Sequence, residues 1–457
     1  MTFQEISREK FESVYYGRTP YVKLFSTEQA WFMLALGEVT LLAVMLKCEI
    51  DKDLNVVILG RDLSKRFRAI DVIPSLNSKK AVVEAMNGRI DNLIAAHVDG
   101  LFPQGDEQGV FDIFRMKVRP EKRNHYLKLL AEDPTHFPAR VMMEELAYWF
   151  KDPDGIFIRG LQGNEFNSRL FELYLHAVFY ELDFIMDRDY PQPDFLLKKE
   201  GQIIAVEATT VSEIFDPADK VEFKPEIFDE LQAYVDAVMP FKFARTLRKK
   251  MRHRPEPEKL AYWELPQTVG HPFVLAVHDY SRRMSMTMSS SAMRAYLYGV
   301  LYKDGAVVPI GEHVNGDDHI PSNFFGNDEN RFLSAVMLPT MATIPKFNRM
   351  GMIAGLQAPN THCVIFGVRT DNDGVPNRYV ARVDDPTYKE FWHEGIFMFH
   401  NPKAVNSLDP ALFPHVVHVF QREDGAIEEW IPANCLLSGT TQMLRVKPED
   451  AQPAAEE

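Results

Sequence analysis

The sequence predicts a mixed α/β protein with two or three domains, because its 457 residues exceed the length of one ordinary domain. Hydrophobic residues make up 46% of the chain and aromatic residues 12%, which is enough to build large buried cores. Between residues 162 and 280, the periodicity of an amphipathic helix is followed by three strands, a second helical stretch and an apolar strand. This alternation of helix and strand patterns is the main reason for assigning the α/β class.

Residues 1–115 are expected to form a β-rich domain. The runs LGEVTLLAVMLKCEI, NVVILGRD and RFRAIDV are rich in β-branched residues and are bounded by turn residues. The most apolar stretch, Trp31 to Leu46, is interrupted by Gly37 and Glu38 and is shorter than the roughly 18 apolar residues of a membrane span, so it predicts a buried hairpin. From Ser78 to His97 the apolar positions have helical spacing, behind a serine that can cap the helix.

Four further segments follow this domain. Residues 116–160 predict a helical linker, in which prolines mark the breaks between helices. Residues 161–300 are the predicted α/β core, and residues 301–446 form a mixed, loop-rich C-terminal region. The stretch 447–457, KPEDAQPAAEE, predicts a mobile acidic tail.

The core begins with a long amphipathic helix in NEFNSRLFELYLHAVFYEL, whose apolar flank is formed by Phe166, Leu170, Leu173, Ala177 and Tyr180. The segments DFIMDRDY, PDFLLKK and GQIIAVEATTV predict three successive strands joined by short turns. Helical sequence then extends to the basic run RTLRKKMRHR, and the apolar run HPFVLAVHDY predicts a buried strand.

Two carboxylates in this core are candidate metal ligands. Asp194 stands at the start of one strand and Glu207 lies in the next, and the short turn between these strands predicts a hairpin that brings both acids to one end. Strand alternation places Thr209 on the same face as Glu207. An acid within an apolar strand is costly to bury without a partner. Since Mg²⁺ needs only one or two carboxylates together with substrate phosphates, the pair predicts a metal site.

The strand that begins with proline and aspartate, the hairpin and the VEATT strand, preceded by a helix bearing RLFELYL, resemble the PD-(D/E)xK nuclease superfamily. The resemblance covers roughly residues 160–280. It implies a restriction-endonuclease-like core of the order αβββαβ, with a β-rich N-terminal domain and a mixed C-terminal extension on either side.

Carried over residue by residue, the resemblance matches Asp194 to the aspartate that follows the proline and Glu207 to the second acid. Glu172 matches the acid that many members place on the first helix, and Glu165 on the same helix face competes for that role. These acids are thereby expected to hold Mg²⁺ or Mn²⁺, with Glu172 acting directly or through water. The carbonyl of Ala208 is a further candidate ligand.

One position departs from the superfamily pattern, which has a lysine two residues after the second acid. Thr209 stands there, and it can donate a hydrogen bond but brings no positive charge. Some members supply this lysine from the following helix, where the candidates are Lys249 and Lys250. Lys250 is favoured because it follows Leu247 by three residues, which places both on the same side of a helix.

The resemblance therefore implies Mg²⁺- or Mn²⁺-dependent hydrolysis of DNA, with Glu172, Asp194, Glu207, Thr209 and Lys250 at the catalytic site. RNA is the alternative substrate, and bacterial restriction or phage defence is a role by analogy with the fold. Two alternatives remain open: a nuclease-like nucleic-acid-binding protein without catalysis, and a scaffold that binds a partner protein through its flanking domains. Cutting of both DNA strands would favour a homodimer.

Basic residues after the core strands are candidate phosphate contacts, namely Arg245, Arg248, Lys249 and Arg252, although a solvated helix face is the alternative. The formal net charge of −14 requires such a patch to be concentrated if the chain binds nucleic acid. For the carboxylates, the alternative to a metal site is that Asp194 caps a turn and Glu207 pairs with Arg245.

The remaining signals favour a cytoplasmic protein without a membrane anchor. The N-terminal residues contain no apolar stretch typical of a signal peptide, and the three cysteines have neither disulfide nor metal-ligand spacing. The pair His278 and Asp279 and the cluster Asp317–His319 are expected to be incidental polar groups. The sequence contains neither a phosphate-binding glycine motif nor a serine nucleophile motif.

Overall fold

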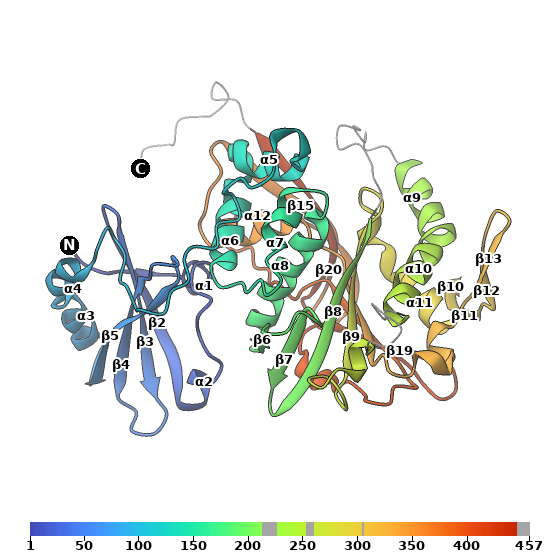
Figure 1. Cartoon of the computed structure of the whole chain (residues 1–457), viewed down its shortest axis with the longest axis horizontal. Coiled ribbons are helices and arrows are strands. Elements are labelled where there is room, and N and C mark those ends of the chain that lie inside the picture. The colour runs from blue at the N-terminus through green and yellow to red at the C-terminus, as the bar shows by residue number, and fades with distance from the viewer. Residues whose placement is uncertain (213–225, 253–259, 304–305, 446–457) are drawn as a thin grey trace.

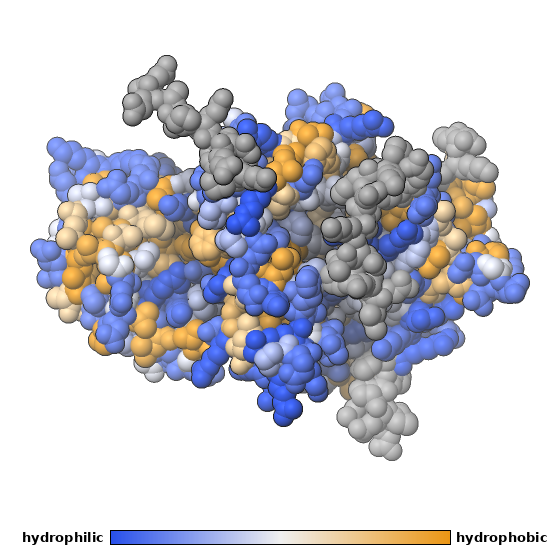
Figure 2. All heavy atoms as spheres, turned by 90° about the horizontal axis from the view of Figure 1, so that it is seen from above, coloured by the Kyte–Doolittle hydropathy of each residue, from blue (hydrophilic) through white to orange (hydrophobic). Residues whose placement is uncertain are grey.

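The computed structural model describes residues 1–212, 226–252, 260–303 and 306–445, so the predicted tail at 447–457 lies outside the described residues. A five-stranded N-terminal sheet lies beside a larger α/β body, which contains all of the candidate site residues (Figure 1). On the face shown in Figure 2, hydrophilic residues are interspersed with smaller hydrophobic patches, as is usual for globular proteins. Among the described residues, no helix is both long and apolar enough to span a membrane.

The N-terminal sheet is antiparallel and follows the chain order β1 (Gln4–Ile6), β2 (Ser26–Leu36), β3 (Val39–Cys48), β4 (Leu54–Arg61) and β5 (Phe67–Leu76). The predicted hairpin is confirmed, with Gly37 at its turn in a left-handed conformation (φ +57°) that suits glycine. The helix expected from residue 78 is capped by Ser78 but interrupted at Gly88, giving α3 (Lys79–Asn87) and α4 (Ile90–Ala96). Short helices α1 (Arg8–Glu12) and α2 (Val22–Phe25) precede β2.

The main sheet has eight strands in the order β19-β18-β17-β14-β9-β8-β7-β6. Strands β6, β7 and β8 form an antiparallel meander, β9 pairs parallel to β8, and β14 pairs parallel to β9. Beyond β14, strand β17 is antiparallel, β18 is parallel to β17, and β19 is antiparallel at the edge. The strands are β6 (Ile185–Asp187), β7 (Phe195–Lys199), β8 (Gln202–Ser212), β9 (Phe273–Tyr280), β14 (Ala335–Pro339), β17 (Ile396–His400), β18 (Val417–Gln421) and β19 (Ile427–Trp430).

Helices cover both faces of this sheet (Figure 1). One face packs against α8 (Phe166–Glu181), together with α5 (His125–Glu132), α6 (Phe137–Ala147), α7 (Phe157–Gln162) and α12 (Ile344–Ile353). The other face packs against α9 (Glu226–Ala237), α10 (Met239–Met251) and α11 (Ser289–Tyr298). In β8, Ile204 and Val206 enter the first core and Ala205 and Val211 the second, as strand alternation requires. Burial on both faces explains why β9 is apolar along nearly its whole length.

Two expected boundaries do not separate structural units. The helices between residues 116 and 160 contribute Leu127, Leu130 and Met143 to the core beneath α8, so this segment is part of the body and not a linker. The sheet also continues across the boundary placed at residue 300, because β14 pairs with β9. Such pairing joins strands far apart in sequence and leaves no local pattern from which to predict it.

The C-terminal region adds smaller elements. A three-stranded sheet has the order β16-β15-β20, with β15 (Thr361–Thr370), β16 (Pro376–Arg382) and β20 (Leu436–Arg445). Two hairpins follow α11, formed by β10 (Val300–Lys303) with β11 (Ala306–Pro309) and by β12 (Glu312–Asn315) with β13 (Asp318–Pro321). The 3-10 helices η5 (Phe324–Gly326) and η6 (Asp328–Asn330) follow β13, and another, η3 (Tyr262–Glu264), lies between α10 and β9.

A fully buried ion cluster ties α12 to the loop before β17. The two oxygens of Glu390 accept hydrogen bonds from Arg349 at 2.7 and 2.8 Å, and one of them also accepts from Lys346 at 2.6 Å. Tyr388 donates its hydroxyl to the same carboxylate at 2.6 Å. Burial alone would raise the pKa of Glu390, but Arg349 and Lys346 more than offset that effect and hold the pKa below its ordinary value.

We predict that Glu390→Gln lowers the free energy of unfolding by about 3–5 kcal/mol at pH 7, because it leaves two buried cations without a counter-charge. Denaturant unfolding followed by circular dichroism measures the change. The matched control is Asp328→Asn, which removes a carboxylate from the exposed pair with Lys403 and should leave stability nearly unchanged. Equal effects of the two substitutions would contradict the role assigned to the cluster.

Candidate active site

The register of the β7–β8 hairpin brings Asp194 and Glu207 together. Phe195, the first residue of β7, lies opposite Val206, so Asp194 just before β7 and Glu207 on β8 are neighbours. The backbone N–H of Asp194 donates to Glu207 Oε2 at 3.3 Å, and the N–H of Ala208 donates to Asp194 Oδ2 at 2.8 Å. Backbone hydrogen bonds thus fix both carboxylates at the same end of the hairpin.

Lys250, in the last turn of α10, supplies a positive charge to this pair. Its Nζ lies 2.6 Å from Glu207 Oε1, and the carboxylate side chain is only 7% exposed. The helix lies at this position because Phe243 and Leu247 are buried in the core between α10 and the sheet. Lys249 faces solvent, and the alternative partner Arg245 is also exposed and does not pair with Glu207.

Tyr262, in η3, completes the surroundings of Glu207. Its hydroxyl hydrogen-bonds with the carboxylate, and its ring centroid lies 5.8 Å from the ammonium of Lys250. Burial, followed by the negative charge of Glu207, raises the pKa of Tyr262 above its ordinary value, so the hydroxyl keeps its proton and donates it. Periodicity could not have found this residue, because it belongs to a short turn outside the strands and long helices.

Glu172 lies on α8 within an arginine network. Arg169 Nη1 is 2.8 Å from Oε1, and Arg188 Nη2 is 3.3 Å from Oε2, so both carboxylate oxygens face a guanidinium group. The guanidinium of Arg188 is also held between the rings of Phe150 and Phe195, at 4.0 and 4.4 Å from their centroids. Any contribution of Glu172 to a metal site would therefore compete with these ion pairs.

Glu165, the alternative to Glu172 as the helix acid, lies at the protein surface. It is the N-cap residue of α8, its side chain is 58% exposed, and it pairs with Arg169 at 2.7 Å. The negative charge of Asp194 contributes to the raised pKa of Glu172. Glu172 is therefore within electrostatic reach of Asp194, whereas Glu165 is an exposed side chain paired with Arg169.

The three acids are electrostatically linked through Asp194. Burial is the largest effect on both glutamates and the charge of Asp194 the second, and together they raise the pKa of Glu172 and of Glu207 to about 7. The opposing influence of Lys250 and Tyr262 on Glu207, and of the two arginines on Glu172, does not cancel this shift. Burial and the charge of Asp194 therefore disfavour the ionised form of both glutamates, and a bound metal ion would favour that form again.

Thr209 takes the position that the superfamily pattern gives to lysine. Alternation places it on the α10 side of β8 with Glu207, where it is partly exposed. Thr210 points to the other face, and its Oγ1 lies 3.0 Å from Ser168 Oγ on α8. The only cation that the described residues provide at Glu207 is Lys250, from the following helix.

The residues described here suit a metal site of few protein ligands. No group of three or more His, Cys, Asp or Glu side chains with metal-binding geometry occurs within the described ranges. Asp194 is only partly buried, and one of its oxygens has no hydrogen-bond partner in the described part of the chain. Mg²⁺ is suited to such a site, because it keeps several waters and is often bound through one or two carboxylates and substrate phosphates.

The other candidate polar groups are structural. His278 and Asp279 are buried at the end of β9, and burial lowers the pKa of His278 to about 3 while its Nε2 accepts a hydrogen bond from Ala342 N–H. Asp279 accepts hydrogen bonds from Ser281 and Ser289. The cluster at residues 317–319 lies on the exposed β12–β13 hairpin.

Comparison with protein-family models, with curated proteins and with solved structures finds no match for this chain. Its function must therefore follow from the fold and from the geometry of the site.

We predict that Asp194→Asn raises the free energy of unfolding by about 1 kcal/mol at pH 8 in the presence of EDTA, since it removes a like charge beside two buried acids. The raised pKa values mean that the folded chain binds more protons than the unfolded chain between about pH 4.5 and 7, so native stability falls as the pH rises through this window. At pH 5 both glutamates are protonated, and the gain should disappear.

The control is Asp189→Asn, which removes an exposed carboxylate paired with Lys151 on the neighbouring loop. It should leave stability unchanged at both pH values. Thermal unfolding at pH 5 and pH 8 makes the comparison, and a loss of stability in Asp194→Asn at pH 8 would show that the three acids do not repel one another.

Proposed function

We propose that this protein is a metal-dependent nuclease that hydrolyses DNA phosphodiester bonds and belongs to the PD-(D/E)xK type. The observation that carries the proposal is the position of Lys250, whose ammonium group lies 2.6 Å from Glu207 at the end of the hairpin that also holds Asp194. A lysine beside two acids is the combination that the pattern requires, although here the lysine comes from α10 and not from β8.

The topology supports the same proposal. The helix α8, the antiparallel strands β6, β7 and β8, the helices α9 and α10, and the strand β9 follow one another in the order αβββαβ. Strand β9 is parallel to β8, as the return through a helical connection requires. A restriction-endonuclease-like core would have this order, with its acids at the β7–β8 hairpin.

The chain's own residues suit a Mg²⁺ or Mn²⁺ ion held by Asp194 and Glu207, with the Ala208 carbonyl as a further oxygen ligand and Glu172 in support. A metal bound there would neutralise charge on the scissile phosphate and lower the pKa of a water. Asp194 is oriented by the Ala208 N–H, and Glu207 by Lys250 and by the hydroxyl of Tyr262.

Lys250 is the group best placed to act on the reacting phosphate. Its ammonium group can stabilise negative charge as it develops on the phosphate and can orient a water by hydrogen bonding. The threonine at position 209 brings no charge to replace it. Arg169 and Arg188, the arginines that pair with Glu172, hold that side chain in place on α8 behind the hairpin.

We expect purified protein to cut DNA in Mg²⁺ or Mn²⁺, and Asp194→Ala and Glu207→Gln to abolish cutting. Lys250→Met should lower the turnover number about 10²–10³-fold, because it removes a charge that acts mainly in the transition state. Lys249→Met is the matched control on the same helix and should keep the turnover number, with any loss confined to KM. Plasmid and oligonucleotide cleavage assays, with RNA as a parallel substrate, make these measurements.

Thermal unfolding of each variant separates loss of catalysis from loss of folding. Equal turnover numbers for Lys250→Met and wild type would remove the lysine from the mechanism. Metal-independent DNA binding without cleavage of any substrate would instead identify a nuclease-like binding protein. Absence of nucleic-acid binding at low salt, together with a stable protein complex, would identify a scaffold. Size-exclusion chromatography with DNA tests the homodimer that cutting of both strands would favour.

A further inference from the structure

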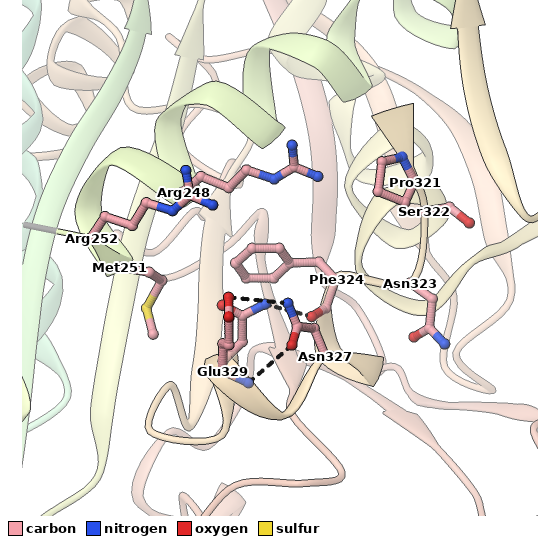
Figure 3. A pocket seen from close by; sticks show the side chains of 10 residues that line it. Arg248, Met251, Arg252, Pro321, Ser322, Asn323, Phe324, Asn327 and Glu329 are labelled. Atoms are coloured by element: carbon pink, nitrogen blue, oxygen red, sulfur yellow. Dashed lines mark hydrogen bonds between the residues drawn. The ribbon is translucent and has the colours of Figure 1, made fainter. Parts of the chain in front are cut away.

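A second concave site lies against α10, away from the carboxylates. It is a cavity of about 260 Å³ between the end of α10, the end of β13 and the turns η5 and η6 (Figure 3). Its walls are formed by Arg248, Met251, Arg252, Pro321, Ser322, Asn323, Phe324, Asn327, Glu329 and Asn330. In Figure 3 both guanidinium groups lie on one side of the Phe324 ring, and Asn327 and Glu329 lie on the other.

The positive charge of the cavity comes from one side of α10. Arg248 and Arg252 are separated by four residues and so lie on the same helix face, one turn apart. Lys250 lies two residues from each, which is about 200° around the helix, and it points to Glu207 on the other side. Within the described part of the chain, Arg252 makes no side-chain hydrogen bond or ion pair, and Arg248 interacts with the hydroxyl of Tyr296.

The opposite wall is held in place by hydrogen bonds within the turns. Asn323 accepts from Gly326 N–H, Asn327 accepts from Glu329 N–H, and Asn330 donates to the carbonyl of Phe324. Glu329 is the one acid among the lining residues, and its carboxylate accepts from the Asn327 amide at 3.5 Å. Two guanidinium groups therefore face a fixed polar wall that contains a single carboxylate.

We infer that this cavity binds the phosphate group of a nucleotide, held by Arg248 and Arg252, with the base or sugar toward Phe324 and the asparagine amides. Guanidinium groups bind phosphate in a bidentate manner, and two of them one helical turn apart suit a tetrahedral anion better than a carboxylate, which one arginine satisfies. An aromatic wall can support a base, whose stacking is tolerant of sequence. A cavity of about 260 Å³ is small for a complete ligand, so it suits the phosphate and the adjoining part of one nucleotide.

The same phosphate chemistry can come from a free nucleotide or from one nucleotide of a bound strand. The inference rests on the proposed function in one respect, namely that a nucleic-acid strand would lie near α10. Binding is therefore measured in EDTA on a Glu207→Gln background, where the proposed nuclease cannot cut. The probes are inorganic phosphate, adenosine 5′-monophosphate, adenosine without phosphate, and a short single-stranded DNA.

The test compares the Arg248→Gln/Arg252→Gln pair with a charge-matched control, Lys80→Gln/Lys128→Gln, which removes two exposed lysines far from the cavity. Isothermal titration calorimetry and fluorescence anisotropy should show that the arginine pair lowers affinity for phosphorylated probes by about tenfold or more, and the lysine pair does not. Arg252→Gln alone should give part of this loss without affecting folding, because the side chain is exposed.

Loss of mononucleotide or phosphate binding in the arginine pair assigns the site to a free nucleotide, and loss of binding to the strand alone assigns it to the substrate; both support the inference. Equal losses in the two double variants, measurable and equal affinity for adenosine and its monophosphate, or no binding of any probe by the parent protein would overturn it. If the protein with Glu207 intact cuts DNA but the arginine pair leaves phosphate binding unaltered, this inference alone is rejected. If the arginine pair loses phosphate binding but the protein with Glu207 intact does not cut DNA under any condition, only the proposed nuclease function is rejected.

Discussion

The burial of Glu207 in an apolar strand is the constraint on which the site depends. A carboxylate with 7% of its side chain exposed is costly unless it is paired and hydrogen-bonded, and three groups meet that need. Lys250 arrives from α10, Tyr262 from a 3-10 turn, and the N–H of Asp194 from the neighbouring strand. Each partner depends on a different feature of the fold. Lys250 depends on the packing of α10 on the sheet, the N–H of Asp194 on the hairpin register, and Tyr262 on the path of the chain into β9.

Two buried glutamates show how neighbouring groups determine the charge state of an acid. Glu390 is surrounded by Arg349, Lys346 and Tyr388, and its pKa is lowered, so it is a permanent anion that fastens α12. Burial and the carboxylate of Asp194 across the hairpin raise the pKa of Glu207, and the one ammonium beside it does not offset them. An acid that the fold leaves under-neutralised is costly to stability, and such costs are concentrated at functional sites.

Much of this arrangement could be predicted from local sequence. The 3.6-residue period found α8, alternation and turn residues found β6 to β8, and the spacing from Leu247 selected Lys250 over Lys249. Tyr262 and Arg188 were missed, because they reach the acids from a short turn and a loop, where no periodicity marks them. The continuation of the sheet through β14 was missed for a related reason, since parallel pairing depends on tertiary packing between distant segments.

Helix α10 carries Lys250 on one side and Arg248 and Arg252 on the other, while Phe243 and Leu247 set its rotation against the sheet. Inserting or deleting one residue after Phe243 would turn the following side chains by about 100° relative to that anchor. The lysine would leave Glu207 and the arginines would leave the cavity in the same event. Insertions or deletions in α10 should therefore impair the protein far more than substitutions on the solvent side of the helix. The rotation of this one helix about its axis sets the geometry of two separate sites.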